Sequence, residues 1–170
     1  MSLKIKKILI LFILFLIPNV VFGNESLKNI GKFKDWETFS MTENENKVCF
    51  AQSIPILQAP KKTEREARLF VTFRSVDKIQ DEVSVTAGYV FNDKNKVTAK
   101  SGKTVLIFST IQENFAWFKE NKTEKKLIKV LKKGSRLMVA GYNIQGSQTI
   151  DHYSLLGFTK AYSTAKKSCS

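Results

Sequence analysis

Residues 136–156, RLMVAGYNIQGSQTIDHYSLL, read as two strands joined by a tight turn. The runs 136–144 and 148–156 are rich in apolar side chains, and they flank Gln145, Gly146 and Ser147. Glycine supplies the positive φ that a tight hairpin turn requires. These residues therefore predict a β-hairpin near the end of the chain.

A second hairpin is predicted upstream, where residues 96–100 and 104–108 flank Ser101 and Gly102. Apolar and polar residues also alternate over 69–74 and 83–88, which is typical of strands with one face on a core. A strand over 48–52 should end before Pro55, because proline cannot pair within a central ladder. The polar segment 58–65 is expected to be a loop. We therefore predict a mainly β fold, an antiparallel β-sandwich of two sheets.

One segment departs from the period of two. Leu127, Ile128 and Leu131 fall on one helical face, Thr123 can cap the N-terminus, and Gly134 suits the position after the C-terminus. This pattern predicts a short helix over 123–133. Residues 161–167 are expected to form a final turn or a short C-terminal helix that brings residue 169 back toward residue 49.

The N-terminal residues have the layout of a secretory signal peptide. Lysines at 4, 6 and 7 precede an unbroken apolar run over 8–17, which is shorter than the roughly 20 residues that span a membrane. Val21 and Gly23 are small enough for a cleavage site. We expect cleavage after Gly23, which leaves a single domain over 24–170, in the periplasm or secreted. The alternative is an uncleaved signal anchor.

Two cysteines, Cys49 and Cys169, lie beyond the expected cleavage site. An exported protein passes through a compartment where thiols oxidise, so we expect a disulfide bond between them. The chain-entropy relation puts its contribution at roughly 4 to 5 kcal/mol for a loop of this length. The alternative is two unrelated thiols, with Cys169 in a frayed tail.

The residues that carry chemistry form no catalytic or metal-binding set, so we expect neither enzyme activity nor a cofactor. His152 is the single imidazole, and a strand would place it with Ser154 on the face opposite Asp151 and Tyr153, so a Ser–His–Asp triad cannot assemble there. Two cysteines cannot complete a four-ligand zinc site. Carboxylates occur in scattered pairs at 64 and 66, 81 and 82, and 120 and 124, and nothing marks a pair as buried.

The chain is basic, with 28 Lys and Arg residues against 15 Asp and Glu and a net charge of +13. Only four of the cations are arginine, and aromatic residues are not interleaved with them as in nucleic-acid binding proteins, so we expect no nucleic-acid partner. The predicted helix carries Lys125, Lys126, Lys129, Lys132 and Lys133. These lysines form either a solvated face or a surface attracted to anionic lipid headgroups or polyanionic envelope polymers.

Several different short motifs are distributed between residue 36 and the C-terminus. They are Trp36, the segments 48–55 (VCFAQSIP), 88–91 (GYVF), 116–117 (AW), 134–141 (GSRLMVAG) and 145–158 (QGSQTIDHYSLLGF), and the terminal Cys169. On these motifs the chain resembles the invasion-associated locus B family of bacterial envelope or secreted proteins. The block that ends in Tyr-Ser-Leu-x-Gly-Phe is the most specific. The resemblance implies an exported, β-sandwich-like domain, a role in host-cell invasion in some members, and no reaction.

The motif residues are expected to serve the architecture rather than a binding site. They are Trp36, Gly88, Tyr89, Trp117, Gly134, Gly141, Gly146, Thr149, Asp151, Tyr153, Ser154, Leu155, Gly157 and Phe158.

We therefore predict a non-enzymatic, exported, virulence-associated protein that binds an envelope component or a partner protein, with a role in host-cell invasion. The alternative is a periplasmic cell-wall or glycan hydrolase or its accessory factor. Peripheral contact with an anionic membrane surface is a further expectation, and the sequence leaves the oligomeric state open.

Overall fold

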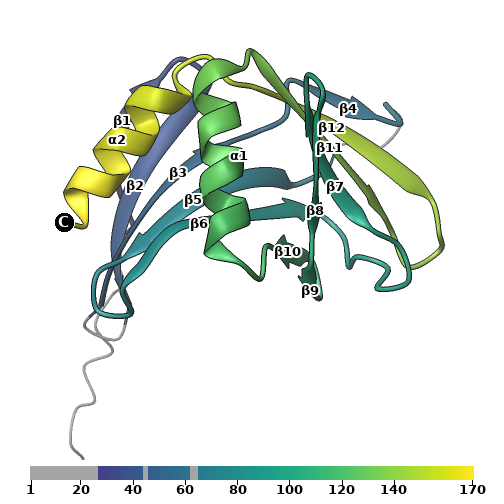
Figure 1. Ribbon diagram of the computed structural model, residues 1–170, viewed down its shortest axis with the longest axis horizontal. Coiled ribbons are helices and arrows are strands. Elements are labelled where there is room, and N and C mark those ends of the chain that lie inside the picture. The colour runs from purple at the N-terminus through teal and green to yellow at the C-terminus, as the bar shows by residue number, and fades with distance from the viewer. Residues whose placement is uncertain (1–26, 44–45, 62–64) are drawn as a thin grey trace, which may run out of the picture.

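A computed structural model describes residues 27–43, 46–61 and 65–170 (Figure 1). The predicted signal peptide, residues 1–23, lies outside the described residues. The elements are β1 (Lys28–Phe33), β2 (Trp36–Glu43), β3 (Asn46–Ser53), β4 (Leu57–Ala59), β5 (Ala67–Arg74), β6 (Ile79–Ala87), β7 (Val97–Ser101), β8 (Thr104–Phe108), β9 (Thr110–Gln112), β10 (Phe115–Trp117), α1 (Asn121–Lys133), β11 (Arg136–Tyr142), β12 (Gln148–Ser154) and α2 (Phe158–Ser168). Neither described helix is long and apolar enough to cross a membrane.

The strands form two antiparallel sheets, as predicted. The larger has the order β1-β2-β3-β5-β6-β10-β9 and the smaller has the order β4-β12-β11-β7-β8. Helix α2 packs on β1, β2 and β3, whereas α1 contacts β6 of the larger sheet and β8 of the smaller one (Figure 1). Helix α1 therefore bridges the two sheets along one side of the molecule.

One hydrophobic core lies between the sheets and beneath the helices. Strand β5 shows how the sequence period produces it, because Leu69, Val71 and Phe73 are buried while their neighbours are partly exposed. The predicted helical face, Leu127, Ile128 and Leu131, is buried in the same cluster. Helix α2 adds Phe158, Ala161, Tyr162 and Ala165.

The structure confirms both predicted hairpins. Strands β7 and β8 are joined at Gly102, with φ +56°, and β11 and β12 are joined by a turn that contains Gly146, with φ +79°. At each of these two positions glycine adopts the left-handed conformation that other residues rarely take.

Both helices differ in detail from the prediction. Helix α1 begins at Asn121 behind Glu120, so the prediction that Thr123 caps it is wrong. Gly134 has an extended backbone, φ −85°, rather than the left-handed one expected after a helix. A side chain there would meet Ser101 Oγ at 2.9 Å, so close packing accounts for this glycine. The C-terminal helix is longer than the predicted 161–167.

Several strands were not predicted. Strands β1, β2, β9 and β10 lie in segments without clear alternation, and β4 lies mostly within the segment 58–65 that was expected to be a loop. Strand β4 is formed by pairing with β12, with Leu57 opposite His152. A three-residue strand is too short to show alternation in the sequence, so pairing with its partner determines whether it forms.

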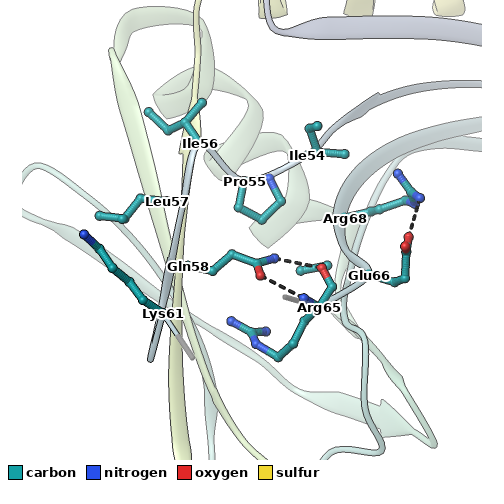
Figure 2. Close-up of a pocket in the computed structure, with 10 residues that line it drawn as sticks. Ile54, Pro55, Ile56, Leu57, Gln58, Lys61, Arg65, Glu66 and Arg68 are labelled. Carbon is teal, nitrogen blue, oxygen red and sulfur yellow. Dashed lines mark hydrogen bonds and ion pairs between the residues drawn. The ribbon is translucent and has the colours of Figure 1, made fainter. Parts of the chain in front are cut away.

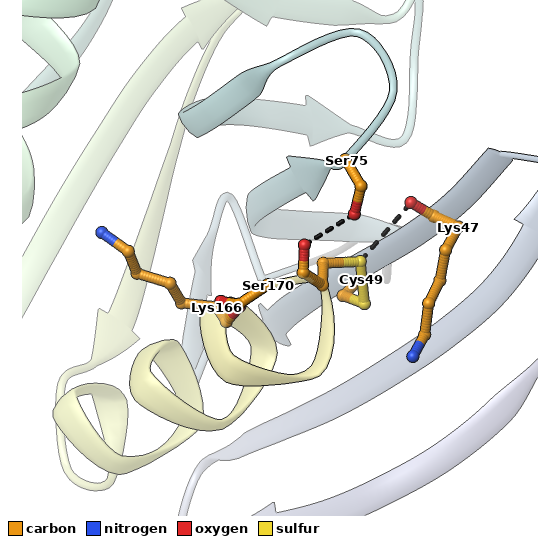
Figure 3. Close-up of a disulfide and its surroundings, with 6 residues drawn as sticks. Lys47, Cys49, Ser75, Lys166 and Ser170 are labelled. Carbon is orange, nitrogen blue, oxygen red and sulfur yellow. Dashed lines mark hydrogen bonds between the residues drawn. A yellow bond between two sulfur atoms is a disulfide. The ribbon is translucent and has the colours of Figure 1, made fainter.

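The structure also confirms the predicted disulfide bond (Figure 3). Cys49 on β3 is bonded to Cys169, directly after α2, with their Cα atoms 5.8 Å apart. Ser75 donates a hydrogen bond of 2.6 Å to the Cys169 carbonyl oxygen. The end of α2 is therefore attached to the larger sheet both covalently and by hydrogen bonding.

Candidate functional site

The inner face of β12 gathers several of the motif residues into one buried layer. Thr149, Asp151 and Tyr153 alternate along this strand and are all buried. The Thr149 hydroxyl lies 2.6 Å from the Tyr89 hydroxyl, which joins two motifs distant in sequence. Burial raises the pKa of Tyr153 well above its ordinary value.

A buried ion pair lies at the centre of this layer. Arg65 makes two hydrogen bonds to Asp151, of 3.0 and 2.5 Å, and the two side chains are 8% and 2% exposed. Arg65 also donates to the Ala87 carbonyl oxygen at 2.8 Å. Burial raises the pKa of Asp151, and the hydrogen bonds from Arg65 offset part of that rise. The Asp151 carboxylate is therefore engaged within the protein.

The sequence reasoning missed Arg65, which it placed in a polar loop. A buried aspartate on the inward face of a strand indicates that a hydrogen-bonded cation is needed, but nothing in the sequence shows that Arg65, 86 positions away, supplies it. Gln58 fixes the backbone of Arg65 through two hydrogen bonds, of 2.9 and 3.0 Å (Figure 2). This contact ties the middle of the short strand β4 to the segment just before β5.

A second set of motif residues packs where β12 leads into α2. The Trp36 indole donates to the Ser154 carbonyl oxygen at 2.9 Å, and its ring lies edge-on to Phe158 with the centroids 4.8 Å apart. Leu155 is buried beside them. Gly157, with φ +92°, passes so close to Phe33 that an added Cβ would lie 1.8 Å from its carbonyl oxygen.

The other motif glycines and Trp117 lie elsewhere. Gly141 packs against Phe91, and Gly88 against the backbone of Glu66. Gly146 faces open space in its turn. Trp117 stacks on Phe115 in β10, with ring centroids 5.6 Å apart.

Within residues 27–43, 46–61 and 65–170, the structure assembles no catalytic set around His152. Asp151 and Tyr153 point into the core, whereas His152 lies on the other face of β12 and is partly exposed. Among the described residues, no group of three His, Cys, Asp or Glu side chains could hold a metal ion.

Two carboxylates that the sequence did not mark as buried are in fact buried. Asp81 accepts a hydrogen bond of 2.6 Å from the Tyr162 hydroxyl, and Glu124 accepts one of 3.1 Å from the Val83 backbone N–H. Burial raises the pKa of Glu124, and the nearby Glu82 and Asp81 raise it further. These acids connect α1 and α2 to β6, and neither lines any of five surface pockets on the described part of the chain.

One surface pocket, of about 530 Å³, lies beside the segment that links β3 to β4 (Figure 2). Ile54, Pro55, Ile56 and Leu57 form one wall, and their apolar side chains are partly or largely exposed. The opposite wall includes Arg68, which pairs with Glu66 at 2.7 Å. Lys61 and Arg65 also line the pocket, and because Arg65 pairs with Asp151, most of its charges are already paired. This composition favours no single class of ligand.

Two adjoining grooves along α1 have a more distinct chemistry. One, of about 810 Å³, lies between α1 and Leu106 of β8, and the other, of about 720 Å³, lies between α1 and the turn of the β7–β8 hairpin. They share Lys126 and Lys129. Together they are lined by six cations, Lys122, Lys125, Lys126, Lys129, Lys133 and Arg136, and by one carboxylate, Glu120. We call these two grooves the lysine groove.

Not every lysine of α1 belongs to the lysine groove. The Lys132 ammonium lies 4.0 Å from the centre of the Tyr162 ring and so faces α2. Five lysines of α1 and Arg136 remain for the groove, and all six are exposed. Their charges are concentrated on one side of the helix, where an anionic ligand would meet several cations at once.

Comparison with known proteins agrees with the fold. The model of the family described as "Invasion associated locus B (IalB) protein" matches residues 36–166. A solved structure, the invasion associated protein B from Bartonella henselae, is similar with a TM-score of 0.54 and 15% sequence identity, over 82% of this chain and 95% of that chain. No curated protein matches the chain.

Proposed function

The chain belongs to the invasion associated locus B (IalB) family, and from this premise we propose that it is an exported protein that binds an anionic component of the bacterial envelope. The observation that carries the proposal is the lysine groove, where six cations meet one carboxylate. Each lysine near an anionic surface contributes about 1 kcal/mol. Six such charges provide several kcal/mol, which is enough for reversible binding.

Export is part of this proposal. The apolar N-terminal run over 8–17 with its preceding lysines has the layout of a secretory signal, and the Cys49–Cys169 bond suits an oxidising compartment. In the periplasm or outside the cell, the anions that the protein meets are lipid headgroups, envelope polymers and acidic protein segments.

We propose a binding role rather than a catalytic one because three buried carboxylates that could react are engaged in the fold. Asp151 pairs with Arg65, Asp81 with Tyr162, and Glu124 with the backbone of β6. The hydrolase alternative needs two free acids that face one substrate pocket. Asp35 and Glu37 do line one surface pocket together, but Glu37 pairs with Lys32 at 3.2 Å, and two lysines, Lys32 and Lys34, line the same pocket.

A role in host-cell invasion is also a proposal, supported by the family description and by the name of the Bartonella protein. Deleting the gene and measuring host-cell entry and growth in parallel tests it. Reduced entry with normal growth supports the role. Normal entry, or an equal loss of entry and growth, contradicts it.

Binding is tested by co-sedimentation with vesicles that contain phosphatidylglycerol and by titration with poly-L-glutamate, both at low and high salt. The variant K125Q/K126Q/K129Q should weaken binding to an anionic probe by at least about tenfold, since three of the six groove charges are lost. A matched control, K28Q/K94Q/K160Q, removes the same charge from exposed lysines outside the groove.

The control should retain most of the affinity, and high salt should abolish binding for all proteins, because the screening length is only about 3 Å at 1 M. Equal losses in the two variants would show that net charge rather than the groove attracts the ligand. No binding of either probe at low salt would refute the proposed function.

A further inference from the structure

The smaller sheet ends in an unprotected strand. Among the strands that the structure describes, β8, Thr104–Phe108, is the last in its sheet and pairs with β7 alone. Edge strands usually carry a charge, a proline or a bulge that prevents further pairing. Strand β8 has the sequence TVLIF and a regular register, so as described it carries none of these.

The β7–β8 hairpin fixes which backbone groups of β8 face outward. Its turn has two residues, Gly102 and Lys103, between the paired Ser101 and Thr104. In such a hairpin the flanking pair is hydrogen-bonded, and the bonding then alternates along the strands. Leu106 and Phe108 therefore bond to β7, whereas Val105 and Ile107 direct their N–H and C=O groups to the free edge.

The free edge is accessible. Val105 and Ile107 are 55% and 44% exposed. Among the described residues, no backbone hydrogen bond outside the helices and the strand ladders involves either of them. The edge therefore presents backbone donors and acceptors at every second residue, which is the pattern that an additional strand would pair with.

The lysine groove borders this edge. Leu106, on the inward face of β8, and the α1 residues Lys122, Lys125, Lys126 and Lys129 line the same groove. Figure 1 shows α1 running alongside β8. A strand added to β8 would therefore have one face toward these lysines and the other face beside Val105 and Ile107.

We propose that β8 and α1 together bind an extended acidic segment of a partner protein by strand addition, in which alternate residues are acidic. Residues opposite Leu106 would point toward the lysines and be Asp or Glu, and residues opposite Val105 and Ile107 would be apolar or β-branched. This inference rests on the proposed function and names the class of its ligand.

The spacings of the two elements agree. Successive side chains on one face of a strand are about 7 Å apart, and lysines three or four residues apart on a helix are separated by about 5 to 6 Å. The flexible lysine stems cover the difference. Three acidic side chains on one face span about 14 Å, somewhat more than the roughly 10 Å along α1 from Lys122 to Lys129, so the segment bound is short.

The test uses a seven-residue peptide in which three glutamates alternate with valine and threonine, titrated into the purified protein by fluorescence anisotropy. Ile107→Pro removes an outward N–H while the bonds to β7 remain, because proline is tolerated at such an edge position. Ile107→Ala keeps the N–H and is the matched control. We expect Ile107→Pro to weaken binding by at least about tenfold and Ile107→Ala to change it by less than about threefold.

A second measurement leaves the protein unchanged and does not depend on how the proline variant folds. N-methylation of alternate peptide residues blocks one edge of the peptide at a time. Strand addition predicts that the peptide loses binding when one set of alternate residues is methylated and keeps it when the other set is. Antiparallel pairing predicts that the loss follows methylation of the valine and threonine residues, whose N–H groups face β8. Equal binding, or equal loss, by both series would overturn the inference.

The outcomes also separate this inference from the proposed function. If poly-L-glutamate and anionic vesicles bind and depend on the groove lysines, but Ile107→Pro and methylation have no effect, the proposed function stands and strand addition is wrong. Binding of vesicles but not of the peptide likewise overturns strand addition in favour of a lipid surface. If Ile107→Pro instead converts a dimer to a monomer and the peptide does not bind, the edge pairs with a second copy of the chain.

Discussion

At the scale of single residues, Gly157 shows how close packing restricts the sequence between β12 and α2. Its backbone has φ +92°, and an added Cβ would meet the Phe33 carbonyl oxygen at 1.8 Å. The contact is with backbone of the neighbouring strand β1, which cannot move away without disturbing the sheet. A side chain at this position therefore carries both a conformational and a steric penalty.

Gly157→Ala should lower the free energy of unfolding by about 3 kcal/mol or more, because strain and overlap add. Gly146→Ala is the control, since Gly146 also has a positive φ, +79°, but faces open space. The control should lower the free energy of unfolding by only about 1 to 2 kcal/mol, because only the penalty for a positive φ applies there. Urea unfolding measures both, and equal losses would show that the overlap at Gly157 relaxes freely.

The Arg65–Asp151 pair makes a second prediction at this scale. Asp151→Asn leaves the Arg65 cation buried without its anion and should cost about 3 to 5 kcal/mol. The double variant R65M/D151L removes both charges and should recover most of that loss.

Arg68→Gln is the control, because its partner Glu66 is 84% exposed and such pairs contribute at most about 1 kcal/mol. Urea unfolding of the single and double variants tests the pair. A double variant no more stable than Asp151→Asn would contradict a purely electrostatic origin for the loss.

Glu124 predicts a pH dependence. Burial raises its pKa above the ordinary value of 4.5, so the folded protein binds the proton before the unfolded chain does as the pH falls. Its contribution to stability is therefore full below pH 4.5 and is lost as the pH rises through the folded-state pKa. The glutamine in Glu124→Gln cannot titrate, so the stability of this variant relative to wild type should be greater at pH 7 than at pH 5. Thermal unfolding at both pH values measures this, and a difference independent of pH would contradict it.

At the scale of elements, α2 depends on the bond at its end. Cys49 and Cys169 are 120 positions apart, a separation for which the chain-entropy relation gives about 5 kcal/mol. Reduction, or C49A/C169A, should lower the free energy of unfolding by up to about that amount and speed amide exchange in α2 more than in β11 and β12. A reducing agent should not affect the double variant. Unchanged unfolding after reduction of the wild type would contradict this account.

Elements with a strong local pattern could be predicted from the sequence, and those that depend on distant partners could not. The β11–β12 hairpin and the buried face of α1 follow from glycine, apolar residues and spacing alone. Strand β4 exists because β12 pairs with it, and Arg65 is buried because Asp151 faces it. Nothing near Thr123 indicates that the chain would begin the helix two residues earlier, behind Glu120.

At the scale of the whole molecule, the fold shows where the excess lysines lie. The sequence placed lysines on a helix but left open whether they form a solvated face or a binding surface. The fold positions four of the five lysines of the predicted helix, together with Lys122 and Arg136, in the two adjoining grooves beside β7 and β8. This juxtaposition of a basic helix and a free strand edge is non-local, and no periodicity in either segment reveals it.

Amide hydrogen exchange at Val105 and Ile107, followed by NMR with and without the alternating acidic peptide, tests the account most directly. Both N–H groups face the free edge of β8, so they should exchange rapidly in the free protein and become protected when the peptide binds. Leu106 and Phe108, bonded to β7, should be protected in both states. If bound peptide leaves Val105 and Ile107 unprotected, or protects the segment around Ile54 and Arg68 instead, the groove between β8 and α1 is not the binding site.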